Sequence, residues 1–276
     1  MALQNAKKLD FMKMHGLGND FVIVDTRASD LRVNSDIARQ IGHRHFGVGF
    51  DQLAVISDGT WGDLDLTFYN ADGSTAGACG NATRCVAQYE MDRLGRDTLT
   101  LATERGQLVA ERAGDMVAVN MGQPLLTWDQ VPLAREMDTL ELPIKGGPTA
   151  TGMGNPHCSF FVPDANAVDL ERFGPEMEHH PLFPKRTNVQ VAHLIGPDHL
   201  RMRVWERGAG ITLASGSSSC AVAVAAHRRG ITGRKVTLDL DGGQIFIDWR
   251  DDGVWMTGPT VHVFNGSFTP DFLAHS

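Results

Sequence analysis

Two short stretches of this 276-residue chain resemble each other and lie about half the chain apart. AGACGNATRC, residues 76–85, leads into one helical sequence, and ITLASGSSSC, residues 211–220, leads into another. Each stretch places a nucleophilic side chain directly before the first glycine of its helix, Cys79 in the first copy and Ser215 in the second. The offset, 215 minus 79, is 136 residues, and it indicates an internal duplication.

The elements expected around the two helices come in the same order. In each half, β-branched or alternating runs typical of strands precede the glycine-started helix, and a meander with short turns follows it. In the first half we predict strands at 21–26, 52–57 and 63–70, helices at 35–43 and 80–94, and a meander over 98–122. In the second half we predict strands at 149–162 and 188–208, a helix from Gly216 that stops at Gly230, and a meander over 235–258.

This order predicts an α/β fold with mixed sheets in two pseudosymmetric domains. The changeover is expected near residues 121–126, which places the domains at 1–122 and 123–265, with the tail 266–276 packed back on the first. The period is too long for a solenoid. Ligand sites favour domain interfaces, so we expect the ligand in a cleft between the two domains.

Charge and hydropathy narrow the class of ligand. The formal net charge is −8 and Lys and Arg are not clustered, which argues against a nucleic-acid partner. No apolar run approaches the roughly 20 residues that cross a bilayer, and residues 1–16 lack the apolar core of a secretion signal. The four cysteines are expected to be thiols, and no His or Cys spacing is typical of a metal site. We therefore expect a cytoplasmic protein that binds a small molecule and holds no metal.

The two helix starts suit acid–base chemistry and anion binding. The N-terminus of a helix lowers the pKa of a thiol, so Cys79 is expected to ionise readily. The backbone N–H groups that follow, at Gly80 and Asn81 and at Gly216 and Ser217, are candidates for holding a carboxylate. Each stretch by itself also fits an ordinary turn, with Cys79 filling the core and Ser215 capping its helix; the pairing of the two favours a shared site.

Two further segments carry titratable groups. GNPHC places His157 between a turn and an apolar strand, and WERG places Glu206 and Arg207 at the end of an apolar strand that leads to the second helix. Such a histidine by itself is more often structural, and such a Glu–Arg pair is more often solvated surface.

Six segments, in order and over essentially the whole chain, resemble the diaminopimelate epimerase family. They are MHGLGNDFVIVD (14–25), FGVGFDQL (46–53), YNADGS with CGNATRC (69–85), GNPHC (154–158), RTNV (186–189) and WERGAGITLASGS (205–217). The resemblance implies interconversion of LL- and meso-diaminopimelate without pyridoxal phosphate or another cofactor, on the route to lysine and peptidoglycan. It also implies that each domain is a sheet wrapped around a central helix, and that the enzyme is a homodimer.

The resemblance further implies two thiols, one on each face of the substrate α-carbon, of which one removes a proton while the other returns one. Cys79 matches the first thiol, His157 matches its partner, and Glu206 matches the partner of the second. Substrate contacts are implied for the amides and the arginine of the motifs, and a backbone carboxylate clamp for the two helix starts. These positions are Asn19, Gln52, Asn70, Asn155, Asn188 and Arg207, and Gly80, Asn81, Gly216 and Ser217.

One departure from the family pattern bears on the chemistry. Ser215 stands where the family has its second catalytic cysteine, and Ser218 stands where glycine is usual. A hydroxyl is far less acidic than a thiol, so Ser215 donates a proton more easily than it accepts one. Three hypotheses follow: an epimerase in which Glu206 or water assists Ser215, a related racemase or one-base dehydratase, or a non-catalytic amino-acid-binding protein. The intact set of matching side chains favours the epimerase.

Overall fold

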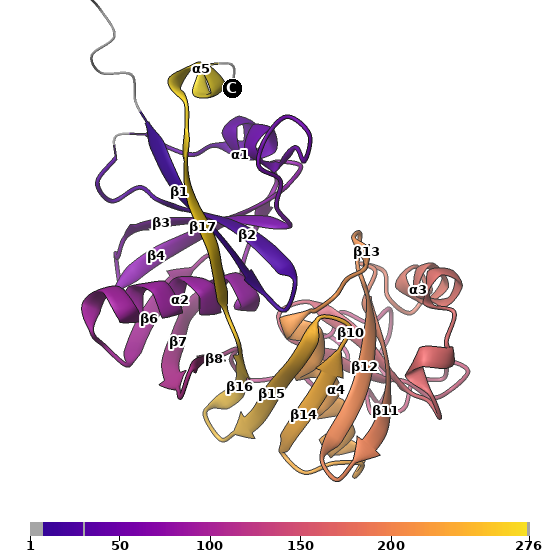
Figure 1. Cartoon of the computed structure of the whole chain (residues 1–276). Coiled ribbons are helices and arrows are strands. Elements are labelled where there is room, and N and C mark those ends of the chain that lie inside the picture. Colours follow the sequence, from indigo (N-terminus) through magenta and orange to yellow (C-terminus); the bar gives the residue numbers. More distant parts are fainter. Residues whose placement is uncertain (1–7, 30, 275–276) are drawn as a thin grey trace, which may run out of the picture. The chain divides into compact units, whose positions relative to one another are not determined.

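The computed structural model describes residues 8–29 and 31–274. The chain divides into two compact units, Met1–Val117 with Pro259–Ser276, and Ala118–Gly258 (Figure 1). The divisions lie earlier than residues 122 and 265, where the sequence suggested them. Backbone bonds explain the difference: β17 (Val261–Phe268) pairs along its length with β1 (Leu9–Gly16), which ties it to the first unit. Met121 and Gly122 bond to Val254 in the second unit.

In the part that the structure describes, the first unit is a mixed sheet with three helices. Its elements are β1, β2 (Asn19–Asp25), α1 (Ser35–Gly42), β3 (Gln52–Asp58), β4 (Leu64–Asn70), β5 (Thr75–Ala76), α2 (Gly80–Leu94), β6 (Thr98–Thr103), β7 (Gly106–Ala113), the start of β8 (Met116–Asn120), β17 and α5 (Pro270–Leu273). The pairs β1/β2, β3/β4 and β6/β7 are antiparallel, whereas β2/β3 and β4/β6 are parallel.

The second unit repeats that pattern of strand directions. Its elements are β9 (Thr149–Gly152), β10 (Pro156–Phe161), the 3-10 turn η1 (Ala165–Ala167), α3 (Leu170–Glu178), β11 (Asn188–Gly196), β12 (His199–Glu206), β13 (Gly210–Ile211), α4 (Gly216–Arg228), β14 (Lys235–Leu240), β15 (Gly243–Arg250) and β16 (Gly253–Gly258). The pairs β9/β10, β11/β12 and β14/β15 are antiparallel, whereas β10/β11 and β12/β14 are parallel. The predicted two-domain α/β fold is confirmed.

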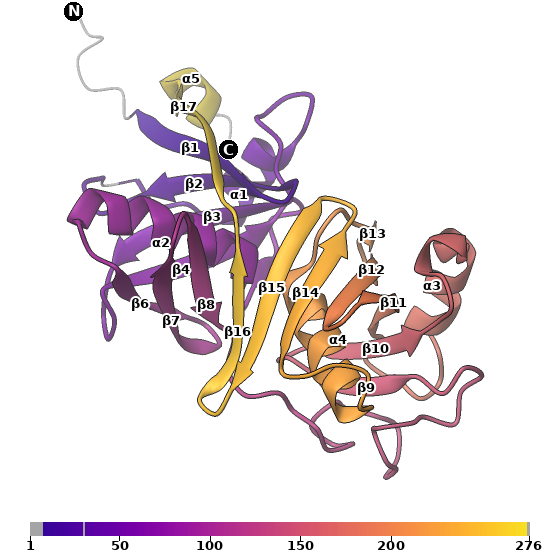
Figure 2. The same ribbon diagram turned by 60° about the horizontal axis from the view of Figure 1, so that its bottom comes forward.

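A buried helix occupies the centre of each unit. In α4 every residue from Gly216 to Ala226 is buried except Ser217, and the helix contacts β9, β10, β11, β14, β15 and β16 (Figure 2). In α2 the residues from Gly80 to Ala87 are all buried, and the helix contacts β1, β2, β6 and β7. A helix buried on every side lies in a core. The N-terminus of each helix is therefore held by the strands around it.

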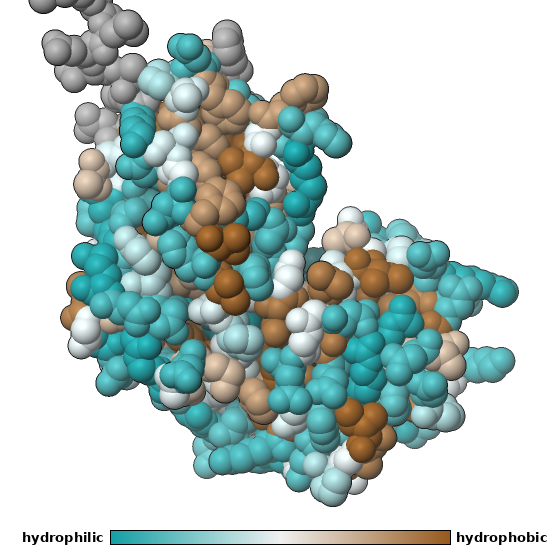
Figure 3. All heavy atoms as spheres, in the orientation of Figure 1, coloured by the Kyte–Doolittle hydropathy of each residue, from teal (hydrophilic) through white to brown (hydrophobic). Residues whose placement is uncertain are grey.

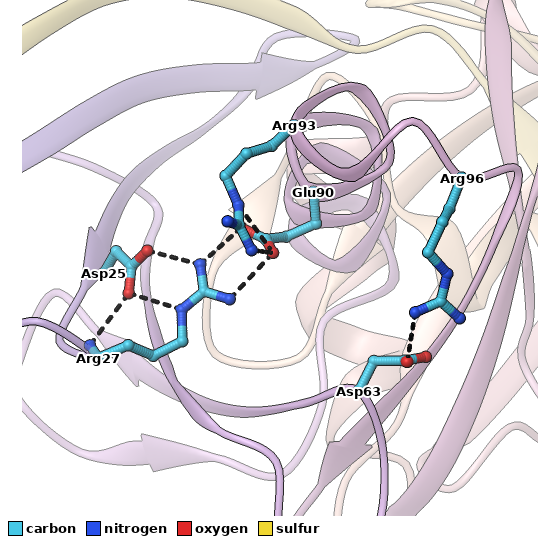
Figure 4. Close-up of polar contacts among 6 residues, drawn as sticks. All are labelled: Asp25, Arg27, Asp63, Glu90, Arg93 and Arg96. Carbon is cyan, nitrogen blue, oxygen red and sulfur yellow. Dashed lines mark hydrogen bonds and ion pairs between the residues drawn. The ribbon is translucent and has the colours of Figure 1, made fainter.

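A charged cluster fixes the second half of α2 to β2. The carboxylate of Glu90 is fully buried and accepts two hydrogen bonds from the Arg27 guanidinium, at 2.7 and 3.0 Å, and further bonds from Arg93 (Figure 4). Arg27 in turn pairs with Asp25 at the end of β2. Within the described ranges, none of the helices has the length and apolar character that crossing a membrane requires.

Candidate active site

In the first unit the predicted site residues gather at one end of the strands, beside the start of α2. Asn19 begins β2, Gln52 begins β3 and Asn70 ends β4. Because β2 and β3 run parallel with Phe21 opposite Gln52, their starts lie together, and antiparallel pairing places Asn70 opposite Gln52.

The second unit brings its own set together in the same way. Asn155 directly precedes β10, Asn188 begins β11 opposite His157, and Glu206 ends β12. The offset of 136 residues, found as 215 minus 79, also relates Asn19 to Asn155, Gln52 to Asn188 and Asn70 to Glu206. The duplication therefore reproduces the site position by position.

Cys79 is the N-cap residue of α2 and is half-buried. Its sulfur accepts the backbone N–H of Ala82 at 3.4 Å, and its carbonyl oxygen accepts both the backbone N–H and the hydroxyl of Thr83, at 2.9 and 2.8 Å. An N–H donor and the positive end of the helix dipole both favour negative charge on this sulfur. The other three cysteines are buried.

A run of side-chain hydrogen bonds fixes the amides of the first unit. Fully buried Arg84 donates to Asn81 Oδ1 at 2.9 Å, Asn81 Nδ2 donates to Asn19 Oδ1 at 3.0 Å, and Asn19 Nδ2 donates to Asp51 at 2.8 Å. The side chain of Asn81 is thus used to orient Asn19. Sequence reasoning missed Arg84 and Asp51, although both lie inside the matched motifs.

The remaining amide pair of the first unit lies across two strands. Gln52 Nε2 donates to Asn70 Oδ1 at 3.0 Å, and Asn70 Nδ2 donates to the hydroxyl of Ser74 at 3.0 Å. These bonds fix which way each amide faces.

Ser215 is the N-cap residue of α4, with backbone angles close to those of Cys79, but its side chain makes no capping bond. Its Oγ instead donates to Glu206 Oε2 at 2.8 Å. The other oxygen of that carboxylate accepts the hydroxyl of Thr212 at 2.6 Å. Ser215 and Glu206 are therefore an oriented hydroxyl–carboxylate pair. The resemblance pairs these two positions as the second thiol and its partner, but the sequence did not give the distance or the orientation.

His157 lies fully buried in β10, and both of its ring nitrogens have partners in the second unit. Nε2 lies 2.9 Å from Asn155 Oδ1, and Nδ1 lies 3.0 Å from Gln190 Nε2. Gln190 Nε2 and Ser215 Oγ each lie 3.0 Å from Ser218 Oγ. Gln190 was missed from the sequence; the one signal is its position two residues beyond Asn188, on the same face of β11.

The loop that carries Arg207 is fixed by two polar side chains. The Arg207 backbone N–H donates to Asn188 Oδ1 at 3.0 Å, while Asn188 Nδ2 donates to the carbonyl of Pro156 at 2.9 Å. Buried Glu178 at the end of α3 accepts the Gly208 backbone N–H at 3.0 Å. In the part of the chain that the structure describes, no three His, Cys, Asp or Glu side chains gather in a way that could hold a metal ion.

Known proteins resemble this chain in sequence and in fold. The family model of diaminopimelate epimerase matches residues 11–127 and 149–263. The diaminopimelate epimerase of Rhodospirillum centenum is 51% identical over 274 residues, which cover 96% of this chain and 94% of that protein. That of Acidiphilium cryptum is 47% identical over 270 residues, covering 96% and 98%.

Solved structures of lower identity share the fold alone. A phenazine biosynthesis protein of the PhzF family from Bacillus anthracis superposes with a TM-score of 0.69 at 12% identity, covering 95% of this chain and 99% of that one. A hydroxyproline epimerase from Agrobacterium vitis superposes with a TM-score of 0.68 at 13% identity, covering 98% and 94%.

Proposed function

The chain belongs to the diaminopimelate epimerase family, and we propose that in this member Cys79 is one of the two acid–base groups while Ser215, assisted by Glu206, is the other. The protein is an isomerase, and its substrate is a small amino acid, diaminopimelate. The proposal concerns how it inverts the α-carbon between the LL and meso isomers without the second thiol.

The observation that carries the proposal is the 2.8 Å hydrogen bond from Ser215 Oγ to Glu206 Oε2. An isolated serine hydroxyl is a poor base because its pKa lies far above working pH. With Glu206 as acceptor, Ser215 takes the α-proton while its own hydroxyl proton passes to the carboxylate. Ser215 begins and ends this transfer neutral, and Glu206 ends as a carboxylic acid. The Cys79 thiol gives its proton to the other face of the carbanion and ends as thiolate.

The reverse direction balances in the same way. Cys79 begins as thiolate and removes the α-proton, leaving a carbanion and a thiol. Protonated Glu206 then gives its proton to Ser215 as Ser215 gives its own to the carbon. The enzyme therefore has two protonation states, and each turnover converts one into the other. In one state Cys79 is a thiolate and Glu206 is a carboxylic acid; in the other Cys79 is a thiol and Glu206 is a carboxylate.

The remaining predicted residues have binding roles in this proposal. The first backbone N–H groups of α2 and α4, at Gly80 and Asn81 and at Gly216 and Ser217, have no acceptor within their own helices and suit a carboxylate. The polar side chains proposed to contact substrate are Asn19, Gln52, Asn70, Asn155, Asn188 and Arg207. His157 is proposed as the partner of the Cys79 thiol, with its ring oriented by Asn155 and Gln190.

Solvent exchange tests the two-base proposal. In D₂O the native enzyme should introduce α-deuterium into both isomers, at unequal rates because the two bases are unequal. Ser215→Ala should retain exchange into the isomer whose α-proton faces Cys79 and lose it from the other, and Cys79→Ala should show the opposite selectivity. Ser219→Ala is the matched control, because within the described residues its hydroxyl bonds only to the Ser215 backbone carbonyl, at 2.8 Å.

Three outcomes would overturn the proposal. Epimerisation by Ser215→Ala at the native rate would mean that Ser215 is not the second acid–base group. Binding without exchange from either isomer would indicate a non-catalytic binding protein. Release of ammonia or a keto acid would indicate a one-base elimination.

We also infer that the enzyme is a homodimer that works in the cytoplasm. β17 exposes three large apolar side chains, Val261, Val263 and Phe264, which are 44, 53 and 46% exposed, and hydrophobic residues line this strand on the surface (Figure 3). Neighbouring exposed apolar side chains are typical of protein interfaces. All four cysteines are thiols, and a cytoplasmic location keeps the Cys79 thiol reduced as the mechanism requires.

A further inference from the structure

The two copies of the duplicated fold differ at four buried positions around the second acid–base group. The second unit has His157, Ser159, Gln190 and Ser218 there, and the first unit has Phe21, Ile23, Ala54 and Ala82. Subtraction gives 136 for each pair, as in 190 minus 54 and 218 minus 82. All eight residues are fully buried. The same fold therefore packs these positions with apolar side chains in the copy that carries Cys79, so packing does not require polar ones in the copy that carries Ser215.

The polar side chains form one continuous chain of hydrogen bonds. Gln190 Nε2 lies 3.0 Å from both His157 Nδ1 and Ser218 Oγ. Ser218 Oγ lies 3.0 Å from Ser215 Oγ, which bonds to Glu206 at 2.8 Å. The chain thus connects the buried histidine to the carboxylate through three strands and the start of α4. A network of buried polar groups costs stability unless each of its members has a hydrogen-bond partner. Each side chain of this network has one.

The number of hydrogens determines the direction of each bond at the serine end. Ser215 has a single hydroxyl hydrogen, and the strongest acceptor beside it is the Glu206 carboxylate. The hydrogen between Ser215 and Ser218 therefore comes from Ser218. Ser218 Oγ also lies 3.5 Å from His157 Nδ1, but Ser215 Oγ, at 3.0 Å, is the nearer acceptor. Ser218 Oγ in turn accepts one amide hydrogen of Gln190.

The histidine end follows from the same count. Ser159 Oγ donates to the amide oxygen of Gln190 at 3.1 Å, so the amide nitrogen faces His157 Nδ1 and donates to it. Nδ1 is then an acceptor, and the ring hydrogen lies on Nε2, where it donates to Asn155 Oδ1. With the opposite Gln190 orientation, the amide oxygen would face Ser218, and Ser218 would donate its one hydrogen to it. No hydrogen would then lie between the hydroxyl oxygens of Ser218 and Ser215.

We propose that Ser218 and Gln190 are positioning residues that make a serine usable where the family has a thiol; this inference rests on the proposed role of Ser215. The Ser218 hydroxyl donates to Ser215 Oγ, which keeps the Ser215 hydrogen directed at Glu206. It also stabilises the negative charge that Oγ gains while it gives its proton to the substrate carbon. Gln190 holds Ser218 in that orientation and holds His157 as the neutral Nε2–H tautomer.

The first unit, which carries the thiol of Cys79, has no counterpart of the Ser218 and Gln190 side chains. Cys79 has Ala82 where Ser215 has Ser218, and Ala54 where the second unit has Gln190. Its sulfur accepts the Ala82 backbone N–H at 3.4 Å. A thiol ionises near working pH, so it needs no second hydroxyl to become a base.

A double-mutant cycle tests the role of Ser218. Ser218→Ala should lower kcat by about tenfold, with KM changed less than about threefold, because it removes one donor to the reacting oxygen. In the Ser215→Cys background the same change should lower kcat by less than about twofold, because the thiol does not depend on that donor. Ser219→Ala, the neighbouring buried serine of α4, should leave kcat unchanged in both backgrounds. Equal losses from Ser218→Ala in the two backgrounds would show a structural role and overturn the proposal.

The ring nitrogens of His157 test the role of Gln190. In the native protein, ¹⁵N NMR should show His157 with protonated Nε2 and unprotonated Nδ1, assigned by comparison with a His157→Asn variant. Gln190→Glu replaces the amide donor by an oxygen acceptor of the same shape, so Nδ1 should gain a hydrogen and kcat should fall by about tenfold or more. A native spectrum with the hydrogen on Nδ1 would contradict the assignment. If Gln190→Glu fails to fold, the native spectrum and the Ser218 cycle still decide.

The two proposals fail separately. Native epimerisation by Ser215→Ala would overturn the role of Ser215 itself. Loss of epimerisation in Ser215→Ala together with unchanged kcat in Ser218→Ala and Gln190→Glu would leave Ser215 as the acid–base group and overturn only the positioning role.

Discussion

Ser215 Oγ lies 2.8 Å from Glu206 Oε2, whereas Cys79 at the equivalent helix start receives a backbone N–H from Ala82 at 3.4 Å. The two copies of one fold therefore place different side chains at the positions proposed for the two acid–base groups. In that proposal the thiol relies on donors that stabilise its anion, and the hydroxyl relies on a carboxylate that accepts its proton.

Glu206→Gln should lower kcat by about 10²- to 10⁴-fold, which is the usual contribution of one positioned proton-transfer group. The amide keeps the shape that Ser215 and Thr212 contact but cannot take the hydroxyl proton. KM should change little, since the binding groups stay in place. Steady-state rates in both directions measure the effect, and a variant within about threefold of native kcat would exclude Glu206 as the proton acceptor.

Ser215→Cys should raise kcat by at least about tenfold, because a thiol at a helix N-terminus accepts the α-proton directly. The dependence on Glu206 should weaken at the same time, so Glu206→Gln should cost less in the Ser215→Cys background than in the native enzyme. The check is the rate of epimerisation in all four proteins. An unchanged rate in Ser215→Cys would mean that residue 215 is not the second acid–base group.

Oxidants and alkylating agents should inactivate the enzyme through Cys79. Burial raises the pKa of Cys85 to about 12 and raises that of Cys158 as well, so neither forms thiolate at neutral pH. Cys79 is half-buried at a helix start, and Ser215 cannot form a disulfide with it. Peptide mass spectrometry after brief iodoacetamide treatment should show modification at residue 79, in step with lost activity. A crosslink between Cys79 and Cys220 after oxidation would contradict this expectation.

The Glu90 cluster should stabilise the fold at neutral pH and lose its effect in acid. Burial opposes ionisation of Glu90, but the hydrogen bonds from Arg27 and Arg93 outweigh burial and hold its pKa below the ordinary value of 4.5. A carboxyl whose pKa is lower in the folded state contributes its full stability above the ordinary value, and that contribution disappears as the pH falls through the folded value.

Urea unfolding of Glu90→Gln at several pH values tests this cluster. At pH 7 the variant should lose about 3 kcal/mol of unfolding free energy, as buried ion pairs do when one partner is removed. The difference from native protein should begin to shrink below about pH 4.5, where the unfolded carboxyl takes up its proton, and should vanish as the pH falls through the lower pKa of the folded carboxyl. Arg96→Ala is the control: it breaks an exposed pair with Asp63 (2.7 Å, Figure 4) and should cost less than about 1 kcal/mol. A Glu90→Gln loss no larger than the control's would mean that the cluster contributes little.

Phe264→Glu should convert the proposed dimer into monomers. The substitution adds a charge to the exposed apolar side chains of β17, where a second copy would have to desolvate it. Sedimentation analysis of the native chain and the variant, at the same concentration, gives the answer. Val109→Glu on β7, another exposed apolar position, is the control and should leave the dimer intact. A native chain that sediments as a monomer would refute the dimer outright.

The sequence by itself determined the two-fold repeat, the fold class and the family. Those features rest on local patterns: strand-like alternation, glycine-started helices, and motifs spaced in a fixed order. The helix starts at Gly80 and Gly216 and the end of α2 at Leu94 follow from such signals. β1, β17 and α3 were not predicted. β17 finds its partner 259 residues earlier in the chain, where Leu9 pairs with Phe268 in a register shifted once by a bulge.

Only the tertiary structure decided what surrounds each acid–base group. Ser218 was noticed in the sequence as an unusual residue, but its bonds to Ser215 and Gln190 depend on how β11 packs against the start of α4. Burial makes these hydroxyls and the amide informative, because away from water each polar hydrogen must have a protein acceptor. The number of hydrogens then determines which group donates in each hydrogen bond. Residue order specifies which groups are present; the distances between them come from long-range packing, which no local pattern encodes.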